Sequence, residues 1–291
     1  MSGRITGNSG GAAILIDRGD IDNLFLLIDF PNRPGSIADR GTFAFYSGRD
    51  IDTIVQSPAA VIVCLFDLKR EIESKNLTGK TIVLADDPQL LFSQIARRKY
   101  GNMMQPQKRW RRNPDGSQPR NSLIQAGAIV YDNVRIGDNC IIAANAVIGD
   151  AGFGFSRDSG GEFVSMPHFG GVTIGNNVEI GPGSVIDCGT FGDTILESNI
   201  RIDNMVQIAH NVTIASGTRI MAGVSISGGV QIGRDCWIAP KAMLRDKIII
   251  GNNVLIGCSS MVTIDIPDNH TYQPTYAEIH KTTTDCERDS K

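Results

Sequence analysis

Aliphatic residues recur every six positions through the second half of the chain, and this period limits the folds that the chain can adopt. Ile, Leu or Val occupies positions 124, 130, 136, 142 and 148, then 174, 180 and 186, and then every sixth position from 196 to 262. The fourth residue after each is usually small or β-branched, as at Val206 and Thr218. Neither an α-helix nor a hairpin sheet keeps such a period, whereas a parallel β-helix does, with about 18 residues in each coil. We therefore predict stacked coils, about 4.8 Å apart, with the aliphatic residues inside.

Two insertions interrupt the period. Residues 149–173 form a Gly- and Phe-rich segment, "GDAGFGFSRDSGGEFVSMPHFGGVT", and four extra residues lie around "CGTFGDT" between Ile186 and Leu196. Loops that leave a rigid solenoid usually line its binding face. His168 in the first insertion is therefore either a substrate contact or an ordinary loop histidine.

The first 101 residues are not periodic and read as a small α/β domain. Short apolar runs at 13–16, 24–30, 61–66 and 81–85 predict strands. Residues 86–101 predict a helix, because Asp87 can cap it, Pro88 fits the first turn and Gly101 can end it. Residues 102–122 are rich in Pro, Asn and Ser and predict a linker. The expected organisation is a domain at 1–101, a linker at 102–122, the β-helix at 123–267 and a short tail at 268–291.

Charge and cysteine content narrow the possible partners. A net charge of −3 gives no general attraction to nucleic acid or to an anionic membrane. The six cysteines form no CxxC pair, which argues against a zinc site and a disulfide framework. No signal peptide and no membrane span are expected, so a cytoplasmic location is the simplest expectation. The basic stretch "KRWRR" at 108–112 is either a solvated connector or a contact for coenzyme A phosphates or an acidic carrier protein.

His210 is the candidate catalytic residue. It is the third residue of its hexad, a position that holds mostly polar residues elsewhere and therefore faces outward. One coil of eighteen residues places Gly228 beside it, and a second coil places Asp246 further along. A glycine leaves room for a ligand and exposes an N–H that can stabilise an oxyanion. Asp203, seven residues earlier, could orient the ring, and this combination suits acyl transfer. A plain surface histidine is the alternative.

Four segments carry a resemblance to a known family. "GDAGFGF", "GGVTIGNNVEIG", "IDCGTFGDT" and "IDNMVQIAHNVTI" resemble the UDP-3-O-acylglucosamine N-acyltransferases of lipid A (lipopolysaccharide) biosynthesis. The resemblance covers about residues 124–267 and extends faintly into the first domain through "GTFAFYSGRD" and "SPAAVIV". It implies a mainly β fold, a left-handed parallel β-helix preceded by a small α/β domain. It also implies a homotrimer with active sites between subunits.

The resemblance assigns roles to residues of this chain. His210 would be the general base, Gly228 the oxyanion N–H and Asp203 the acid associated with the histidine. Phe45 would stack on uracil. An acyl group would pass directly from a thioester of acyl carrier protein or coenzyme A to the amine of a UDP-linked amino sugar, with no metal and no other cofactor. Further substrate-binding positions would be Gly48, Asn204, Asp246, Lys247 and His168.

Three departures from the family keep a second function open. Gly48 stands where the family has a uracil-contacting Asn, and Lys247 stands where it has a second histidine. The residues after Pro267 are polar and fewer than the family's helical extension. The alternative is an acetyl-CoA-dependent N-acetyltransferase acting on a nucleotide-linked amino sugar for O-antigen or capsule. A non-catalytic solenoid scaffold is the hypothesis from another class.

Overall fold

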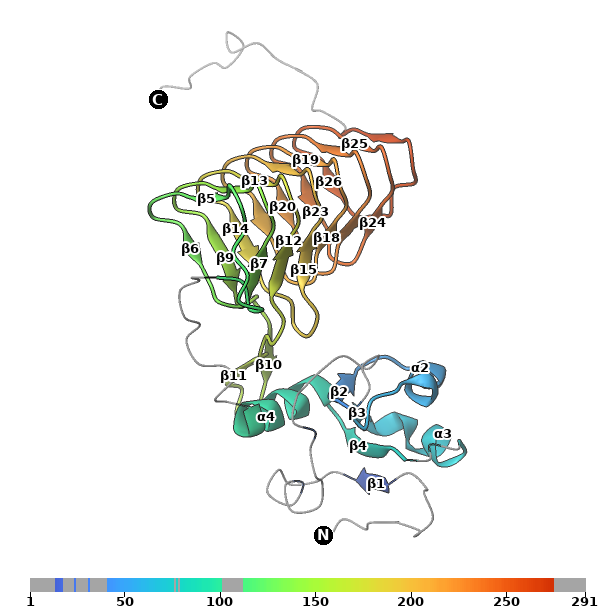
Figure 1. Cartoon of the computed structure of the whole chain (residues 1–291). Coiled ribbons are helices and arrows are strands. Elements are labelled where there is room, and N and C mark those ends of the chain that lie inside the picture. Colours follow the sequence, from blue (N-terminus) through green and yellow to red (C-terminus); the bar gives the residue numbers. More distant parts are fainter. Residues whose placement is uncertain are drawn as a thin grey trace, which may run out of the picture.

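The computed structural model describes residues 14–17, 24, 31, 41–75, 77, 79–100 and 112–274. Figure 1 shows a solenoid of stacked triangular coils and a smaller α/β domain, joined on one side by a hairpin that projects from the solenoid. The linker residues 102–111, with most of the basic stretch at 108–112, and the tail residues 275–291, with His280, lie outside the described residues.

The small domain is built on a four-stranded parallel sheet in the order β1-β4-β3-β2. The expected strands near 13–16, 61–66 and 81–85 are present, whereas Leu24 is helical and 25–30 lie outside the described residues. A strand at 43–46 was not expected from the apolar runs. The elements are β1 (Ile14–Asp17), β2 (Phe43–Tyr46), α2 (Ile51–Gln56), β3 (Val61–Leu65), the 3₁₀ helix η1 (Phe66–Leu68), α3 (Lys69–Glu73), β4 (Thr81–Ala85) and α4 (Pro88–Tyr100).

Helix α4 covers one face of this sheet and follows the predicted capping pattern. The Leu90 amide donates to Asp87 Oδ1 at 2.9 Å, so Asp87 caps the helix. Phe92 on α4 stacks on Phe43 of β2 with ring centroids 4.7 Å apart. Helix α4 therefore carries aromatic side chains that pack against the sheet on one side and against the inserted loops of the solenoid on the other.

Three parallel sheets form the walls of the solenoid, and the chain visits them in the order I, II, III in each coil. Sheet I holds β5 (Leu123–Ile124), β8 (Ile141–Ile142), β13 (Glu179–Ile180), β16 (Arg201–Ile202), β19 (Arg219–Ile220), β22 (Trp237–Ile238), β25 (Leu255–Ile256) and β27 (Thr271–Tyr272). Sheet II holds β6 (Ile129–Val130), β9 (Val147–Asp150), β14 (Val185–Asp187), β17 (Gln207–Ile208), β20 (Ser225–Ile226), β23 (Met243–Leu244) and β26 (Met261–Val262). Sheet III holds β7 (Val134–Ile136), β12 (Val172–Ile174), β15 (Thr194–Leu196), β18 (Thr213–Ile214), β21 (Gln231–Ile232) and β24 (Ile249–Ile250).

The mainly β fold, a parallel β-helix with its aliphatic residues inside, is confirmed. Every predicted inward position from Val130 to Val262 is at most 3% exposed, and Ile124 is partly buried at the open end. Stacking does not stop at Pro267, because β27 pairs with β25 through Leu255 and Thr271. Burial of this continuous column supplies the main stabilising free energy of the solenoid.

Sharp turns join the sheets at each corner. The third residue after the inward aliphatic position adopts a left-handed backbone with φ between 55° and 82° in most coils, and it is usually Asn or Gly, as at Asn177 and Gly217. Both residues tolerate this conformation better than others. Met205 and Lys247 occupy it as well, at φ 55° and 61°.

The two insertions connect the solenoid to the small domain. The first contains the antiparallel hairpin of β10 (Phe155–Arg157) and β11 (Phe163–Ser165), which lies next to α4 in Figure 1. Met166 Sδ lies 3.2 Å from Ser93 Oγ of α4. Phe191 from the second insertion packs edge-on against Phe92, with ring centroids 5.4 Å apart. Both inserted loops therefore contact α4 of the small domain.

Candidate active site

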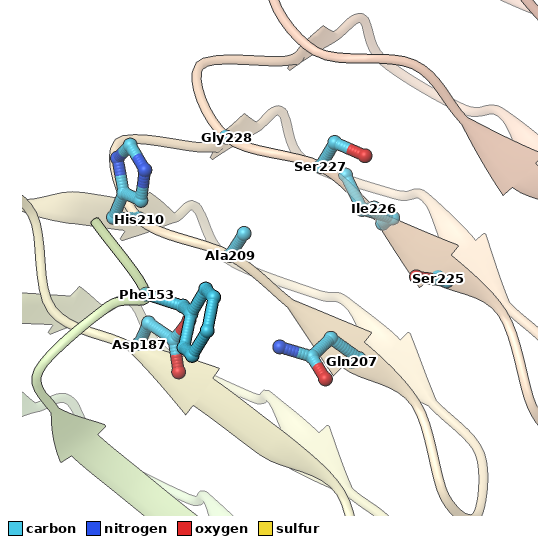
Figure 2. Close-up of a pocket in the computed structure, with 9 residues that line it drawn as sticks. All are labelled: Phe153, Asp187, Gln207, Ala209, His210, Ser225, Ile226, Ser227 and Gly228. Carbon is cyan, nitrogen blue, oxygen red and sulfur yellow. The ribbon is translucent and has the colours of Figure 1, made fainter. Parts of the chain in front are cut away.

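An open cavity of about 220 Å³ lies on the outer face of sheet II, at its corner with sheet III (Figure 2). Its polar lining comes from neighbouring coils, and the side chain of Phe153 from the first insertion forms part of its wall. We call it the His210 pocket. Its lining residues are Phe153, Asp187, Gln207, Ala209, His210, Ser225, Ile226, Ser227 and Gly228.

The predicted register around His210 is confirmed. Gln207 pairs with Ser225, and Ser225 pairs with Met243, so successive coils are offset by eighteen residues here. Gly228 consequently lies against the imidazole, because a Cβ built at Gly228 would be 2.8 Å from His210 Cε1. Any side chain at this position would displace the ring, so the glycine is required for the ring to lie over the neighbouring coil.

Asn211 fixes the proton on the His210 ring. The Thr190 amide donates to Asn211 Oδ1 at 3.0 Å, and Asn211 Nδ2 donates to the Gly192 carbonyl at 3.2 Å. These backbone partners determine which end of the amide is oxygen. His210 Nδ1 lies 3.0 Å from that oxygen, so Nδ1 carries the proton and donates it. Nε2 is left with its lone pair, which is the state a general base needs.

The Gly228 amide is the second reactive group. At the same position of other turns the N–H donates to a side chain, as Ser216 N does to Glu197 Oε2 and Arg234 N to Asn252 Oδ1. Within the described residues the Gly228 N–H has no such partner, and Gly228 lines the His210 pocket. It is therefore available to an oxygen of a bound ligand.

Asp187 is a pocket residue that sequence reasoning did not identify. Its side chain lies on the coil before His210 and the residue is only 8% exposed. Burial and the nearby Asp150 raise the pKa of its carboxyl to about 6, against the opposing charge of His210. An eighteen-residue count does not place Asp187 next to His210, because the second insertion lengthens this coil to 22 residues and Val185 pairs with Gln207.

His168 of the first insertion lies beside His210, and its role as a substrate contact stays a prediction. The two ring centroids are 5.3 Å apart at an angle of 67°. Burial and the charge of His210 lower the pKa of His168 to about 4, and the hydrogen bond from Nδ1 to the Met166 carbonyl opposes this. His168 is thus neutral near pH 7, and its buried Nε2 has no partner in the described part of the chain.

Asp203 and Asn204 lie away from the pocket in this chain. They form the corner between sheets I and II, at the opposite end of β17 from His210. Asp203 Oδ1 accepts from the Asn204 amide at 2.8 Å. The structure therefore does not support a contact in which Asp203 orients His210, and Asn211 makes that contact. The catalytic role of Asp203 and the substrate-binding role of Asn204 stay predictions.

Asp246 and Lys247 share the corner of His210 but are one coil beyond Gly228. The Lys247 amide donates to the Gly228 carbonyl at 3.0 Å, and both side chains are exposed. They do not line the His210 pocket, although they extend the same outer surface. Their substrate-binding role also stays a prediction.

The expected nucleotide-binding residues lie in the small domain. The half-buried Phe45 packs against Phe92 and Phe191, with ring centroids 5.1 and 6.2 Å away. A Cβ at Gly48 would lie 2.5 Å from the Tyr46 hydroxyl oxygen, so the Tyr46 side chain occupies the space beside this glycine. Tyr46 is thus the neighbour at the position where the family carries an Asn. The role of Phe45 stays a prediction.

Two further searches of the described residues gave negative results. They contain no group of three or more His, Cys, Asp or Glu residues arranged to hold a metal ion. None of their helices is long and apolar enough to cross a bilayer.

Comparison with known proteins supports the repeat and names relatives. The sequence matches the family described as bacterial transferase hexapeptide (six repeats) over residues 120–150 and 229–263. A UDP-3-O-acylglucosamine N-acyltransferase of Polynucleobacter asymbioticus is 46% identical over 86 residues, covering 28% of this chain and 24% of the relative. One of Coxiella burnetii is 45% identical over 76 residues, covering 26% of this chain and 22% of the relative. The chain thus spans about a quarter of the length of these relatives.

Solved structures with some likeness include two UDP-N-acetylglucosamine acyltransferases. That from Bacteroides fragilis is 24% identical, covers 52% of this chain and 60% of that chain, and has a TM-score of 0.43. That from Arabidopsis is 18% identical, covers 53% of this chain and 60% of that chain, and has a TM-score of 0.44. The β-helix is assigned from the three sheets of the chain itself. The chain carries hexapeptide repeats and is similar, over about a quarter of its length, to UDP-3-O-acylglucosamine N-acyltransferases.

Proposed function

We propose that the protein is an N-acyltransferase that moves an acyl group from a thioester to the amine of a UDP-linked amino sugar, as in lipid A biosynthesis. The observation that carries the proposal is the pairing, in one pocket, of a fixed imidazole lone pair with an amide N–H that has no partner among the described residues. The similarity to proteins named UDP-3-O-acylglucosamine N-acyltransferase supports acyl transfer to nitrogen as the reaction class. Gln207, Ser225 and Ser227 offer polar partners for sugar hydroxyls on the same wall.

The chemistry follows from the positions of these groups. His210 Nε2 accepts a proton from the amine while the amine nitrogen attacks the thioester carbonyl. General base catalysis of this kind raises the reaction rate about 10²–10⁴-fold. The Gly228 N–H donates to the oxygen that gains negative charge, and one such donor is worth about 10²–10³-fold. The C–S bond then breaks and the thiolate takes the proton from His210. Transfer is direct, with no acyl-enzyme and no cofactor besides the thioester.

The donor is a thioester of acyl carrier protein or of coenzyme A, and the active assembly is a homotrimer in the cytoplasm. Exposed apolar side chains on the outer face of sheet II, such as Met243 and Met261, support burial against other subunits. Unpaired cysteines, including the buried Cys188, are compatible with a reducing compartment.

Replacement of His210 tests the proposal. We expect His210→Ala to fold normally and to lose at least about 100-fold in turnover, because a general base is removed. The assay incubates UDP-linked amino sugars with acyl-carrier thioesters or acetyl-CoA and identifies products by mass spectrometry.

The matched control is His270→Ala, at an exposed histidine whose Nδ1 bonds to the Asp268 carbonyl far from the pocket. It should retain full turnover. Product from acetyl-CoA alone would favour the acetyltransferase for O-antigen or capsule. Unchanged turnover in His210→Ala would reject the assigned base, and no product from any pair would favour a scaffold.

A further inference from the structure

The carboxylate of Asp187 is the unexplained group in the His210 pocket. No hydrogen bond to either of its oxygens is found among the described residues, although the residue is only 8% exposed and lines the pocket. The groups that act on it electrostatically are His210 and Asp150. Figure 2 shows Asp187 and His210 on the same side of the pocket, with Phe153 in front of the carboxylate. A largely buried carboxylate without a donor from the protein is costly, and a donor from whatever occupies the pocket offsets that cost.

Amines and hydroxyls differ in how many donors they bring to such a pocket. A neutral primary amine has two N–H groups, so it can give one to His210 Nε2 and keep the other for a second acceptor. A hydroxyl has one O–H, which the base takes, and it would leave the neighbouring carboxylate without a donor. A site with a base and a separate acceptor therefore favours nitrogen.

We propose that Asp187 accepts the second N–H of the reacting amine and thereby selects nitrogen over oxygen as the acyl acceptor. This inference rests on the proposed function, since it names the acceptor atom of the same site. During transfer the C–N bond forms and the C–S bond breaks. One proton passes from nitrogen through His210 to the departing sulfur. The other stays on nitrogen and becomes the amide N–H, still directed at Asp187.

A buried carboxylate that is retained for binding lowers the stability of the folded protein when it is ionised. Burial raises the pKa of Asp187 to about 6, above the value near 3.9 of an unfolded chain, so the ionised form disfavours the folded state. This loss of stability grows as the pH rises from about 4 to 6 and is complete above that range. We expect Asp187→Asn, which cannot ionise, to raise the unfolding midpoint at pH 7.5 and to leave it nearly unchanged at pH 4. A carboxylate that held the fold together would give the opposite sign.

The decisive experiment compares a UDP-linked 2-amino sugar with its 2-hydroxyl counterpart, using the full chain. Dissociation constants are measured by calorimetry without donor, and product formation is followed by mass spectrometry. We expect the wild type to bind the amine at least about 10-fold more tightly than the hydroxyl compound. In Asp187→Ala this preference should fall to about twofold, and kcat/KM for the amine should drop about 100-fold while KM for the donor stays constant.

The matched control is Asp235→Asn, a carboxylate-to-amide change at an exposed turn on a different corner of the coil. It should keep both the preference and the midpoint of the wild type. An amine preference in Asp187→Ala equal to that of the wild type would overturn the inference. Failure of the wild type to acylate the amine with any donor would instead overturn the proposed function.

Discussion

At the scale of single residues, Asn211 holds three groups in place at once. Its Oδ1 accepts from the Thr190 amide and from His210 Nδ1, and its Nδ2 donates to the Gly192 carbonyl. Its backbone has φ 60°, a conformation that Asn tolerates well. One side chain thus ties the second insertion to the catalytic ring and sets the tautomer of that ring.

Replacement of Asn211 should separate these effects. Asn211→Gly keeps the left-handed backbone but removes the acceptor, so we expect turnover to fall about 10-fold or more because the ring is no longer held. Asn211→Asp keeps the acceptor and adds a charge that stabilises the imidazolium. The acidic limb of the kcat/KM profile should therefore move to higher pH. Both variants are read from pH–rate profiles between pH 5 and 9.

Asn253→Gly makes the same change at a left-handed turn on another corner, and its profile should match the wild type. An Asn211→Gly profile indistinguishable from the wild type would show that the amide does not orient the base.

The contrast between Gly228 and Asp187 explains how much of the site the sequence could predict. Gly228 follows His210 by one regular coil, so counting eighteen residues places it correctly. Asp187 precedes His210 across a coil lengthened by the second insertion, and no regular count finds it. Asn211 orients the ring through backbone groups of that irregular loop, which periodicity does not describe. The offset of seven residues suggests Asp203 as a partner of His210, but β17 separates the two and places Asp203 at another corner of the coil.

At the scale of elements, the hexad predicts both the inward residue and the turn that follows. The inward positions from Val130 to Val262 are buried, and most third residues after them adopt positive φ. The short strands of the small domain were harder to predict. Phe43 and Ala44 of β2 are both buried, so this strand lacks the alternation that marks a half-exposed strand.

The turn at Met205 tests whether a residue that tolerates positive φ stabilises this position of the hexad. Met205 has φ 55° and is 75% exposed, so its side chain adds little packing while its backbone is strained. We expect Met205→Asn to raise the free energy of unfolding by about 0.5–1 kcal/mol, because Asn tolerates the left-handed region. Chemical denaturation measures the change.

Met205→Ala is the control, since it shortens the side chain but keeps the strain, and it should gain nothing. A midpoint for Met205→Asn no higher than that of Met205→Ala would contradict the strain argument.

At the scale of the whole molecule, aromatic contacts attach the small domain to the solenoid. Phe191 meets Phe45 and Phe92, and Phe169 meets Tyr100 with ring centroids 6.0 Å apart. Phe191 belongs to the loop that Asn211 holds, so the expected nucleotide side of the molecule is connected to the catalytic ring through one loop.

Truncation of Phe191 should loosen this attachment. We expect Phe191→Ala to cost roughly 2 kcal/mol, the value of removing a partly buried aromatic side chain. Hydrogen exchange should then accelerate in α4 and β2, while sheets I to III keep their protection. Mass spectrometry of deuterium uptake resolves these segments.

Trp237→Ala, a larger truncation on the outer face of sheet I, should leave exchange in α4 unchanged. Equal protection of α4 in Phe191→Ala and the wild type would mean that this contact does not hold the small domain.

Because each coil repeats the one before it, the number of coils between two residues sets their separation along the solenoid axis. An extra coil added after Tyr272, the end of β27, would lengthen the prism by about 4.8 Å and leave every existing strand pairing unchanged. The same segment inserted between Ala215 and Ser225 would be buried equally well. It would nevertheless move the Gly228 amide one coil away from the His210 imidazole. A chain that folds with full stability would then have lost the proposed transferase activity.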